Sequence, residues 1–203
     1  IVAGMMAGTV SRKDLIDKRR MQTRDHVLLT KGVAVEGTAI IAREFGDRLK
    51  QMGLLADEID HCCHFLDHIS VMNEAEIAAQ NPGTSAMHDV TEGGLAAALA
   101  ELSIAGGHKI KVNMNKIPVY PDTQKICDLL DIDPLGLIGS GSLLICCRNA
   151  DSHELMQRID AAGVEITSIG EVSDKGQEIQ AYKGKKQVSW PTFEVDEITK
   201  LFE

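Results

Sequence analysis

The chain has 203 residues, 44% of them hydrophobic, so it can form one substantial hydrophobic core or one domain with an added subdomain. Its formal net charge of -9 argues against nucleic acid as a partner, because neutralising a phosphate backbone needs clustered Lys and Arg. No run approaches the roughly 20 apolar residues that span a bilayer, so no membrane insertion is expected. Five cysteines, an odd number with two adjacent pairs, do not make a disulfide framework and indicate the reducing cytoplasm.

The start of the chain has no Met at position 1, and residues 1–10 read as the tail of a strand. We therefore expect the chain to be a fragment of a longer protein. Residues 13–21 are charged and fit either a short helix capped by Ser11 or an exposed connector. Residues 26–30 predict a strand, because their continuous apolar run suits burial on both faces.

The next part of the chain carries mainly helical patterns. Ile41, Phe45, Leu49 and Met52 recur on one stripe of a predicted helix that Gly53 ends. A second helix is predicted at residues 56–65, a strand at residues 69–72, and a short helix at residues 74–80.

A strand-to-helix turn is predicted between residues 84–90, which read as a strand, and Leu95, Leu99 and Leu102, which recur at helical spacing. Thr91 is a candidate cap for that helix, and Gly93-Gly94 allows another group to approach the backbone closely. The free N–H groups of the first turn favour an anion there. The alternative is that Asp89 and Thr91 only cap the helix, and that the two glycines only permit close packing.

The remaining chain alternates strands with helices, which predicts an α+β (α/β layered) fold with a mixed sheet packed with helices. The predicted strands lie at residues 109–114, 143–147, 165–172, 177–182 and 187–190, and the predicted helices at residues 123–130, 152–162 and 195–202.

Two further loops have a composition suited to phosphate. Lys31-Gly32 and then Glu36-Gly37-Thr38 connect the strand at residues 26–30 to a helix, and Gly139-Ser140-Gly141-Ser142 precedes the strand at residues 143–147. Each could instead be an ordinary turn. One helix end contributes about 0.3–1 and up to ~2 kcal/mol to anion binding, so two ends would give only about millimolar affinity. Nucleotide binding would therefore need a further domain or Mg²⁺.

His61, His64 and His68 would share one face of a helix, a spacing compatible with a metal. No closed tetrahedral ligand set accompanies them, so we predict no intrinsic metal site. Of the adjacent pair Cys62-Cys63, at least one is expected to be buried as a small hydrophobe. Adjacent Cys146 and Cys147 should point to opposite faces of a strand, which argues against a catalytic dithiol.

Three motifs in order carry a resemblance to a known family: His88-Asp89-Val90-Thr91-Glu92-Gly93-Gly94-Leu95, Ile117-Pro118 and residues 139–145. They resemble the C-terminal domain of the aminoimidazole ribonucleotide (AIR) synthase superfamily. Residues 25–42 also match the strand, loop and helix with which that domain opens. Within that superfamily the chain is most similar to the hydrogenase maturation factor HypE and HypE-like AIR-synthase-related proteins. The resemblance implies that residues 1–22 are the linker and tail of a missing N-terminal ATP-binding domain, and that residues 23–203 are the C-terminal domain.

The resemblance also implies a function. The intact protein would be an ATP-dependent enzyme of the ligase or dehydratase type in hydrogenase maturation, using ATP and Mg²⁺, and this fragment alone would be inactive. Its partners would be the missing N-terminal domain, a second copy in a homodimer, and other maturation proteins. Within the shared cleft, His88 and Asp89 are the catalytic candidates, orienting a substrate or a Mg²⁺-bound water. The candidate cofactor-binding residues are Lys31, Gly32, Glu36, Gly37, Thr38, Thr91, Glu92, Gly93, Gly94, Ser140 and Gly141.

One departure from the resemblance concerns the last residues. HypE ends in a cysteine that accepts the carbamoyl group, whereas this chain ends Lys200-Leu201-Phe202-Glu203. Unless the terminus was trimmed, this favours a HypE-like paralogue with another substrate. The alternatives are an AIR-synthase-type ligase of purine biosynthesis, which formylglycinamidine ribonucleotide would stimulate to hydrolyse ATP, and a non-catalytic binding or assembly module using the histidine face.

Overall fold

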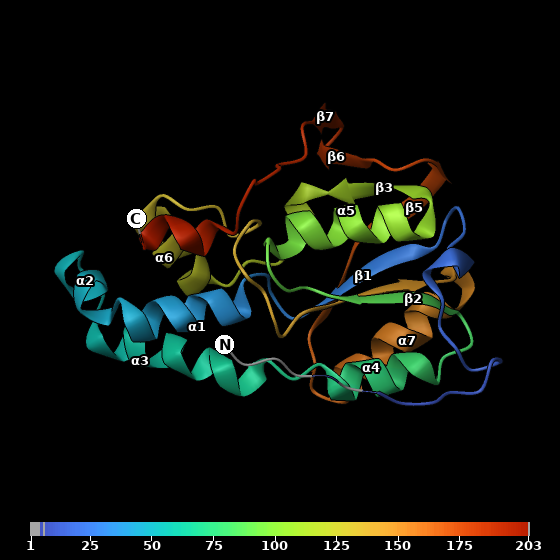
Figure 1. Ribbon diagram of the computed structural model, residues 1–203, viewed down its shortest axis with the longest axis horizontal. Helices are drawn as coiled ribbons and strands as arrows, with labels where there is room; N and C mark the ends of the chain where they lie inside the picture. Colours follow the sequence, from blue (N-terminus) through green and yellow to red (C-terminus); the bar gives the residue numbers. More distant parts are fainter. Residues whose placement is uncertain (1–4, 6, 203) are drawn as a thin grey trace.

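A seven-stranded mixed sheet forms the centre of the computed structural model, which describes residue 5 and residues 7–202 (Figure 1). The strand order is β2-β4-β1-β5-β3-β6-β7, and neighbours are antiparallel except β3 and β6, which are parallel. The predicted α+β fold with a mixed sheet is confirmed. The strands are β1 (His26–Thr30), β2 (Thr84–Asp89), β3 (His108–Asn113), β4 (Leu143–Cys147), β5 (Ile166–Lys175), β6 (Ile179–Lys183) and β7 (Lys186–Val188).

Helices cover both faces of the sheet, and a further group lies beside it (Figure 1). The α-helices are α1 (Val35–Glu44), α2 (Gly46–Gln51), α3 (Ala56–Cys63), α4 (Met72–Ala79), α5 (Gly94–Gly106), α6 (Pro121–Leu130) and α7 (Asn149–Ala161). Four short 3₁₀ helices are η1 (Lys18–Arg20), η2 (His64–His68), η3 (Met114–Lys116) and η4 (Glu197–Leu201). No helix among the described residues has both the length and the apolar character needed to cross a membrane.

Successive residues of the central strands enter different hydrophobic cores. Val27 and Leu29 of β1 belong to the core that α5 covers, whereas Leu28 lies in the core that α4 and α7 cover. Because side chains alternate between the faces of a strand, only a continuous apolar run can fill both cores. A third core joins α1, α2, α3 and α6 beside the sheet. The N-terminal ends of α1 and α5 both lie toward the region between the sheet and this helical group (Figure 1).

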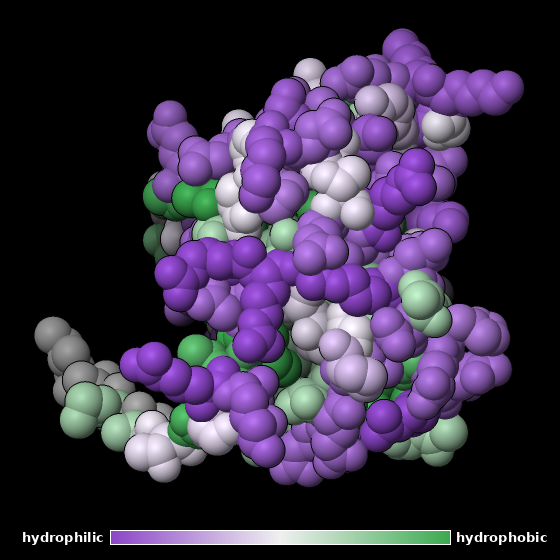
Figure 2. All heavy atoms as spheres, turned by 90° about the vertical axis from the view of Figure 1, so that its right-hand side faces the viewer, coloured by the Kyte–Doolittle hydropathy of each residue, from purple (hydrophilic) through white to green (hydrophobic). Residues whose placement is uncertain are grey.

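Polar side chains dominate the face of the molecule that lies at the right of Figure 1, with small apolar areas recessed between them (Figure 2). A partly buried ion pair joins Arg148, next to β4, to the buried Asp25, which precedes β1. Ser85 of β2 also donates to the Asp25 carboxylate at 2.7 Å. The pair therefore fixes the start of β1 to the two strands at this edge of the sheet.

The predicted strand at residues 69–72 is wrong. No strand forms there, and α4 begins at Met72. The ammonium group of Lys31 binds the carbonyl oxygens of His68 and Ser70 at 3.0 and 2.7 Å, so these groups accept from a side chain rather than from a neighbouring strand. The edge strands of the sheet are β2 and β7.

Several predicted helices differ in extent or type. The helix expected to carry Ile41 through Met52 is divided at Phe45, whose φ of -117° is not helical. The helix predicted over residues 56–65 is α-helical only to Cys63 and continues as η2. At the end of the chain, the helix expected over residues 195–202 is the single 3₁₀ helix η4, capped by the side chain of Asp196.

Of the two alternatives predicted for residues 13–21, the exposed connector fits better than a helix capped by Ser11. The helix expected within residues 13–21 is reduced to η1, and Asp17, not Ser11, caps it. Of the strand tail expected at residues 1–10, residues 1–4 and 6 lie outside the described residues, and the others form no strand.

Candidate functional site

Three loops meet at one end of the sheet, and we call them the loop cluster: residues 31–38, 90–94 and 136–142. The first two follow the C-terminal ends of β1 and β2, and the third precedes β4, which lies antiparallel between those strands. Antiparallel pairing places the end of one strand beside the start of its neighbour. The sheet order therefore brings together three segments that are far apart in the sequence.

Direct hydrogen bonds join the first and third loops. The Gly37 amide donates to the Ile138 carbonyl at 3.0 Å, and the Ser142 hydroxyl donates to the Gly32 carbonyl at 2.5 Å. The second and third loops are joined in the same way, because the Gly139 amide donates to the Thr91 carbonyl at 3.3 Å. The three predicted phosphate-binding segments are thus one connected structure.

Two glycines of the loop cluster lie where another segment of the chain comes very close. A Cβ atom on Gly94, which has a φ of +60°, would stand 2.6 Å from the carbonyl oxygens of Leu135 and Leu137. A Cβ atom on Gly37 would stand 2.5 Å from the Leu137 side chain. Both positions therefore need glycine because of contacts within the chain.

Thr38 is also held by internal contacts. Its buried hydroxyl lies 2.7 Å from the Ala34 carbonyl oxygen, to which it donates, and 2.8 Å from the Thr123 hydroxyl. Gly32 and Gly141 are buried as well. Of the eleven cofactor-binding candidates, those that solvent reaches are Lys31, Glu36, Thr91, Glu92, Gly93 and Ser140.

The prediction that Thr91 caps α5 is wrong. The N-cap residue is Gly93, whose φ of +75° lies in the left-handed region that glycine adopts at no steric cost. Thr91 contributes to this turn through its backbone carbonyl, which accepts a hydrogen bond from the Gly94 amide at 3.0 Å. Without a Cβ at this corner, a carboxylate from elsewhere in the chain can reach the Gly93 amide.

That carboxylate belongs to Asp196, which the sequence did not single out. Asp196 accepts a hydrogen bond from the Gly93 amide at 2.7 Å and another from the Ile138 amide at 3.2 Å. At the N-terminal end of α5, where an anion was expected, the Gly93 amide donates to a carboxylate of the same chain. No local pattern links residue 196 to residue 93, so only the folded structure identifies the pair.

Lys31 is surrounded by oxygen atoms. Its Nζ lies 2.9 Å from Oε1 of Glu74, whose side chain is 1% exposed, and 2.8 Å from the carbonyl oxygen of Gly141. The carbonyl oxygens of His68 and Ser70, described above, are its other two acceptors. These contacts use the three N–H donors of the ammonium group and tie the loop cluster to the start of α4.

Glu36 in the first turn of α1 offers a free acceptor. Its Oε2 atom is buried and has no hydrogen-bond partner among the described residues. Glu92 is exposed in the second loop, and Ser140 is half-buried in the third. These three side chains lie on the three separate loops of the cluster.

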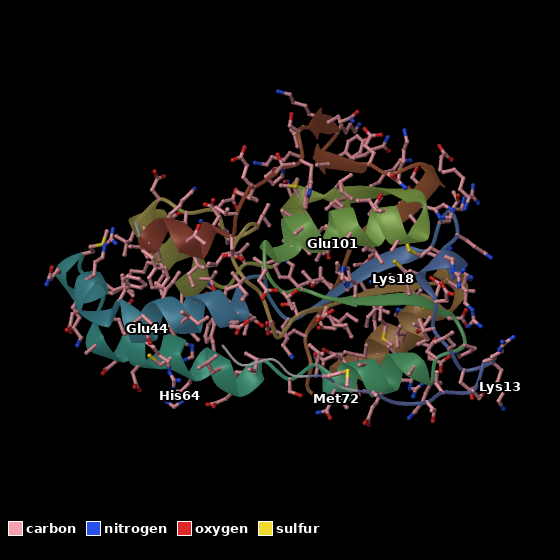
Figure 3. The ribbon with its side chains drawn as sticks, in the orientation of Figure 1. Lys13, Lys18, Glu44, His64, Met72 and Glu101 are labelled. Atoms are coloured by element: carbon pink, nitrogen blue, oxygen red, sulfur yellow. The ribbon has the colours of Figure 1, made fainter. Side chains whose placement is uncertain are left out.

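The two catalytic candidates lie at the end of β2. His88 is 15% exposed, and its Nε2 lies 2.9 Å from Oε2 of Glu101, which projects from α5 (Figure 3). Its Nδ1 lies 3.6 Å from Oδ1 of Asp89, whose side chain is 64% exposed. The imidazole therefore lies between two carboxylates, both of which are largely exposed to solvent.

The three histidines on α3 and η2 do not converge. His64 projects outward at the lower edge of this region (Figure 3), with its Nδ1 3.0 Å from Asp67, whereas Nε2 of His61 lies 3.6 Å from Asp122 of α6. Among the described residues, no group of three His, Cys, Asp or Glu side chains could hold a metal ion.

All five cysteines are free thiols, and four are buried. Burial raises the pKa of Cys62, Cys127 and Cys147 to about 12, and the pKa of Cys146 is raised by the same cause. Cys146 and Cys147 lie in different cores on opposite faces of β4, as predicted. They cannot act as a pair.

The sheet order, the helix layers and the connected loops define a class of protein: an α+β domain that presents a cluster of glycine-containing loops at one end of its sheet. The family described as AIR synthase related protein, C-terminal domain, matches residues 25–182. The chain belongs to this family.

Relatives and solved structures are consistent with that membership. The chain is 28% identical over 193 residues to the carbamoyl dehydratase HypE of Cupriavidus necator, covering 90% of this chain and 51% of that protein. The crystal structure of Escherichia coli HypE aligns with a TM-score of 0.68 at 21% identity, over 89% of this chain and 54% of that one. HypE in complex with ATP aligns with a TM-score of 0.66 at 16% identity, over the same shares. The chain thus spans about half the length of these relatives.

Proposed function

We propose that this chain forms one wall of an ATP- and Mg²⁺-dependent site in a HypE-like hydrogenase maturation protein. The other wall is an N-terminal domain that corresponds to the half of the relatives that the chain does not span. The observation that carries the proposal is the loop cluster, in which hydrogen bonds join three segments that the resemblance assigns to the cleft. Membership in the AIR synthase related family and the similarity to HypE support it.

The residues of the loop cluster fit a shared site better than a complete one. Magnesium is commonly bound through one or two carboxylates together with substrate phosphates and waters. The buried, unpartnered Oε2 of Glu36 and the exposed carboxylate of Glu92 provide such groups. The Gly93 and Ile138 amides already donate to Asp196, so phosphate oxygens need donors from the other domain as well.

The chemistry that bound ATP supplies is activation of an amide or related oxygen by phosphoryl transfer. Around the phosphates, the residues of this chain would position the phosphate groups and stabilise their charge. Glu36 and Glu92 would contact the cation, and Ser140 would donate its hydroxyl. His88 and Asp89 would orient a substrate or a water at the end of β2.

The proposed partners follow from this arrangement. The N-terminal domain completes the cleft, and a second copy completes a homodimer. Other maturation proteins deliver or receive the substrate.

Calorimetry with ATP and Mg²⁺ tests the proposal. It compares the full-length gene product with this chain, each measured unaltered and with the substitution Glu36→Gln. Glu44→Gln is the matched control, because Glu44 lies on the same helix but is exposed at its far end (Figure 3). We expect tight binding by the full-length protein only, weakened about tenfold by Glu36→Gln, the scale of one charge-assisted contact. We expect no change from Glu44→Gln. Absence of full-length binding, or equal binding by both variants, would contradict the proposal.

A further inference from the structure

A cavity of about 390 Å³ lies beside the loop cluster, between α1, α3, η2, the start of α6 and the turn from α7 to β5. Only Lys31 and Val35 belong to both the cavity and the cluster. Its volume is within the range of small-molecule sites, roughly 300–1,000 Å³. The geometry points to a binding pocket for a small organic cation, an ammonium group carried on an aromatic or short aliphatic body.

Aromatic rings form one wall of this cavity. The centroids of His61 and Phe65 are 5.5 Å apart, and those of Phe65 and Tyr120 are 5.6 Å apart, each pair packed edge to face. Phe65 is buried, so its ring is held in place. An organic cation gains attraction from the face of such rings when it lies within about 6 Å of their centroids.

Two carboxylates border the same cavity. Glu165 lies in the turn before β5 and accepts a hydrogen bond from the Tyr120 hydroxyl through Oε2 at 3.0 Å. Asp122 lies in the first turn of α6, 3.6 Å from Nε2 of His61. The Tyr120 contact orients the Glu165 carboxylate beside the aromatic wall. A cation in the cavity would therefore meet a ring face and a carboxylate together.

The positive groups of the cavity do not oppose this charge. Lys31 is the lysine that lines the cavity; its side chain is 12% exposed, and its ammonium group is paired with Glu74. Its remaining contacts are to three backbone carbonyls. The other basic side chains of the lining are His61 and His68, which the formal charge at pH 7 counts as neutral. The two carboxylates thus leave the cavity with a net negative charge.

The charged and aromatic groups of the cavity distinguish a cation from other ligands. An anion would meet Glu165 and Asp122 without a free ammonium group to pair with, and a neutral apolar ligand would gain nothing from the two carboxylates. An ammonium ligand satisfies both the rings and the carboxylates.

The test uses the 203-residue chain labelled with ¹⁵N and two probes of nearly equal shape, phenethylammonium and neutral 2-phenylethanol, in NMR titrations at about pH 8. We expect phenethylammonium to bind about tenfold more tightly, from the sum of one cation–π contact and one partly exposed ion pair. The shifted amides should be those of residues 61–68, 120–122 and 163–165. Equal affinities, or shifts confined to other parts of the chain, would overturn the inference.

Two variants separate the ring from the charge. Glu165→Gln keeps an acceptor for Tyr120 and removes the charge, and Phe65→Leu removes a ring face while keeping an apolar side chain. Each should weaken phenethylammonium binding about three- to fivefold. Glu154→Gln, at an exposed position of α7, is the control and should bind as the unaltered chain does. If both pocket variants keep their folded spectra and their affinity, the pocket does not recognise a cation.

Discussion

The carboxylate of Asp196 lies 2.7 Å from the backbone nitrogen of Gly93, at the N-terminus of α5. The same carboxylate accepts from the amides of Ile138 and Ile198 at 3.2 and 3.0 Å. A residue close to the C-terminal end of the chain therefore joins the second and third loops of the cluster. The anion that the turn at residues 90–94 attracts is thus supplied by the chain itself.

Replacing Asp196 should loosen the loop cluster. Asp196→Ala leaves the Gly93 and Ile138 amides without their charged acceptor, and we expect a loss of about 1–3 kcal/mol in the free energy of unfolding. Urea denaturation measures it. Glu194→Ala, two residues earlier at an exposed position, should change the stability by less than about 0.5 kcal/mol. Equal effects of the two substitutions would show that the Asp196 contacts contribute nothing specific.

The two ends of α5 offer a matched test of close backbone approach. Gly94 and Gly107 have φ values of +60° and +65°, but only at Gly94 would a Cβ meet carbonyl oxygens, at 2.6 Å. Gly107→Ala should cost about 1–2 kcal/mol from the left-handed conformation alone. Gly94→Ala should cost clearly more, because the third loop must also move. Thermal denaturation of both variants decides, and a Gly94→Ala cost no larger than that of Gly107→Ala would contradict the close approach.

Lys31 and Glu74 should prove energetically coupled. Lys31→Met leaves the buried Glu74 carboxylate without its ammonium partner, and breaking such a pair costs about 3–5 kcal/mol. The double variant Lys31→Met with Glu74→Gln removes the uncompensated charge and should be more stable than Lys31→Met alone. A double-mutant cycle in urea measures this coupling, and strictly additive losses would rule it out.

Tyr120 should make stability fall at alkaline pH. Burial, and then the nearby Glu165 carboxylate, raise the pKa of Tyr120 to about 12, whereas an unfolded tyrosine titrates near pH 10. Between these values the unfolded state has lost the phenol proton that the folded state retains. The stability that Tyr120 contributes through its raised pKa is therefore fully present below about pH 10 and is lost as the pH rises through about 12.

The measurement compares unfolding free energies of the unaltered chain and Tyr120→Phe at several pH values from about 9 to about 12. As the pH rises, the unfolding free energy of the unaltered chain should fall relative to that of Tyr120→Phe. Parallel curves would show that Tyr120 titrates normally.

Cysteine reactivity should follow burial. Because burial raises the pKa of Cys62, Cys127, Cys146 and Cys147, these thiols stay protonated and shielded at about pH 8. A thiol reagent should modify the half-buried Cys63 first in the folded chain and all five cysteines in denaturant. Rapid modification of Cys146 or Cys147 in the native state would contradict the two-faced packing of β4. Mass spectrometry of the modified peptides provides the readout.

The strands and the fold class could be predicted because their signals are local. The apolar run before Thr30 marks β1, and the structure assigns that strand to the predicted residues. The strand predicted at residues 84–90 likewise corresponds to β2 within one residue. The strand predicted at residues 69–72 failed because a local apolar pattern cannot show whether a neighbouring strand is present to pair with it.

The sequence by itself determined the family resemblance, the mixed sheet packed with helices and the three glycine-containing loops. These depend on patterns within about ten residues, which side-chain alternation and helical spacing impose. Only the tertiary structure decided which groups form hydrogen bonds and ion pairs with the residues of those loops. Asp196 accepts from the Gly93 amide across 103 residues, and Lys31 binds Glu74 across 43. Such pairs form because unpaired buried donors and charges are costly once the chain is compact, and that cost has no signature in the local sequence.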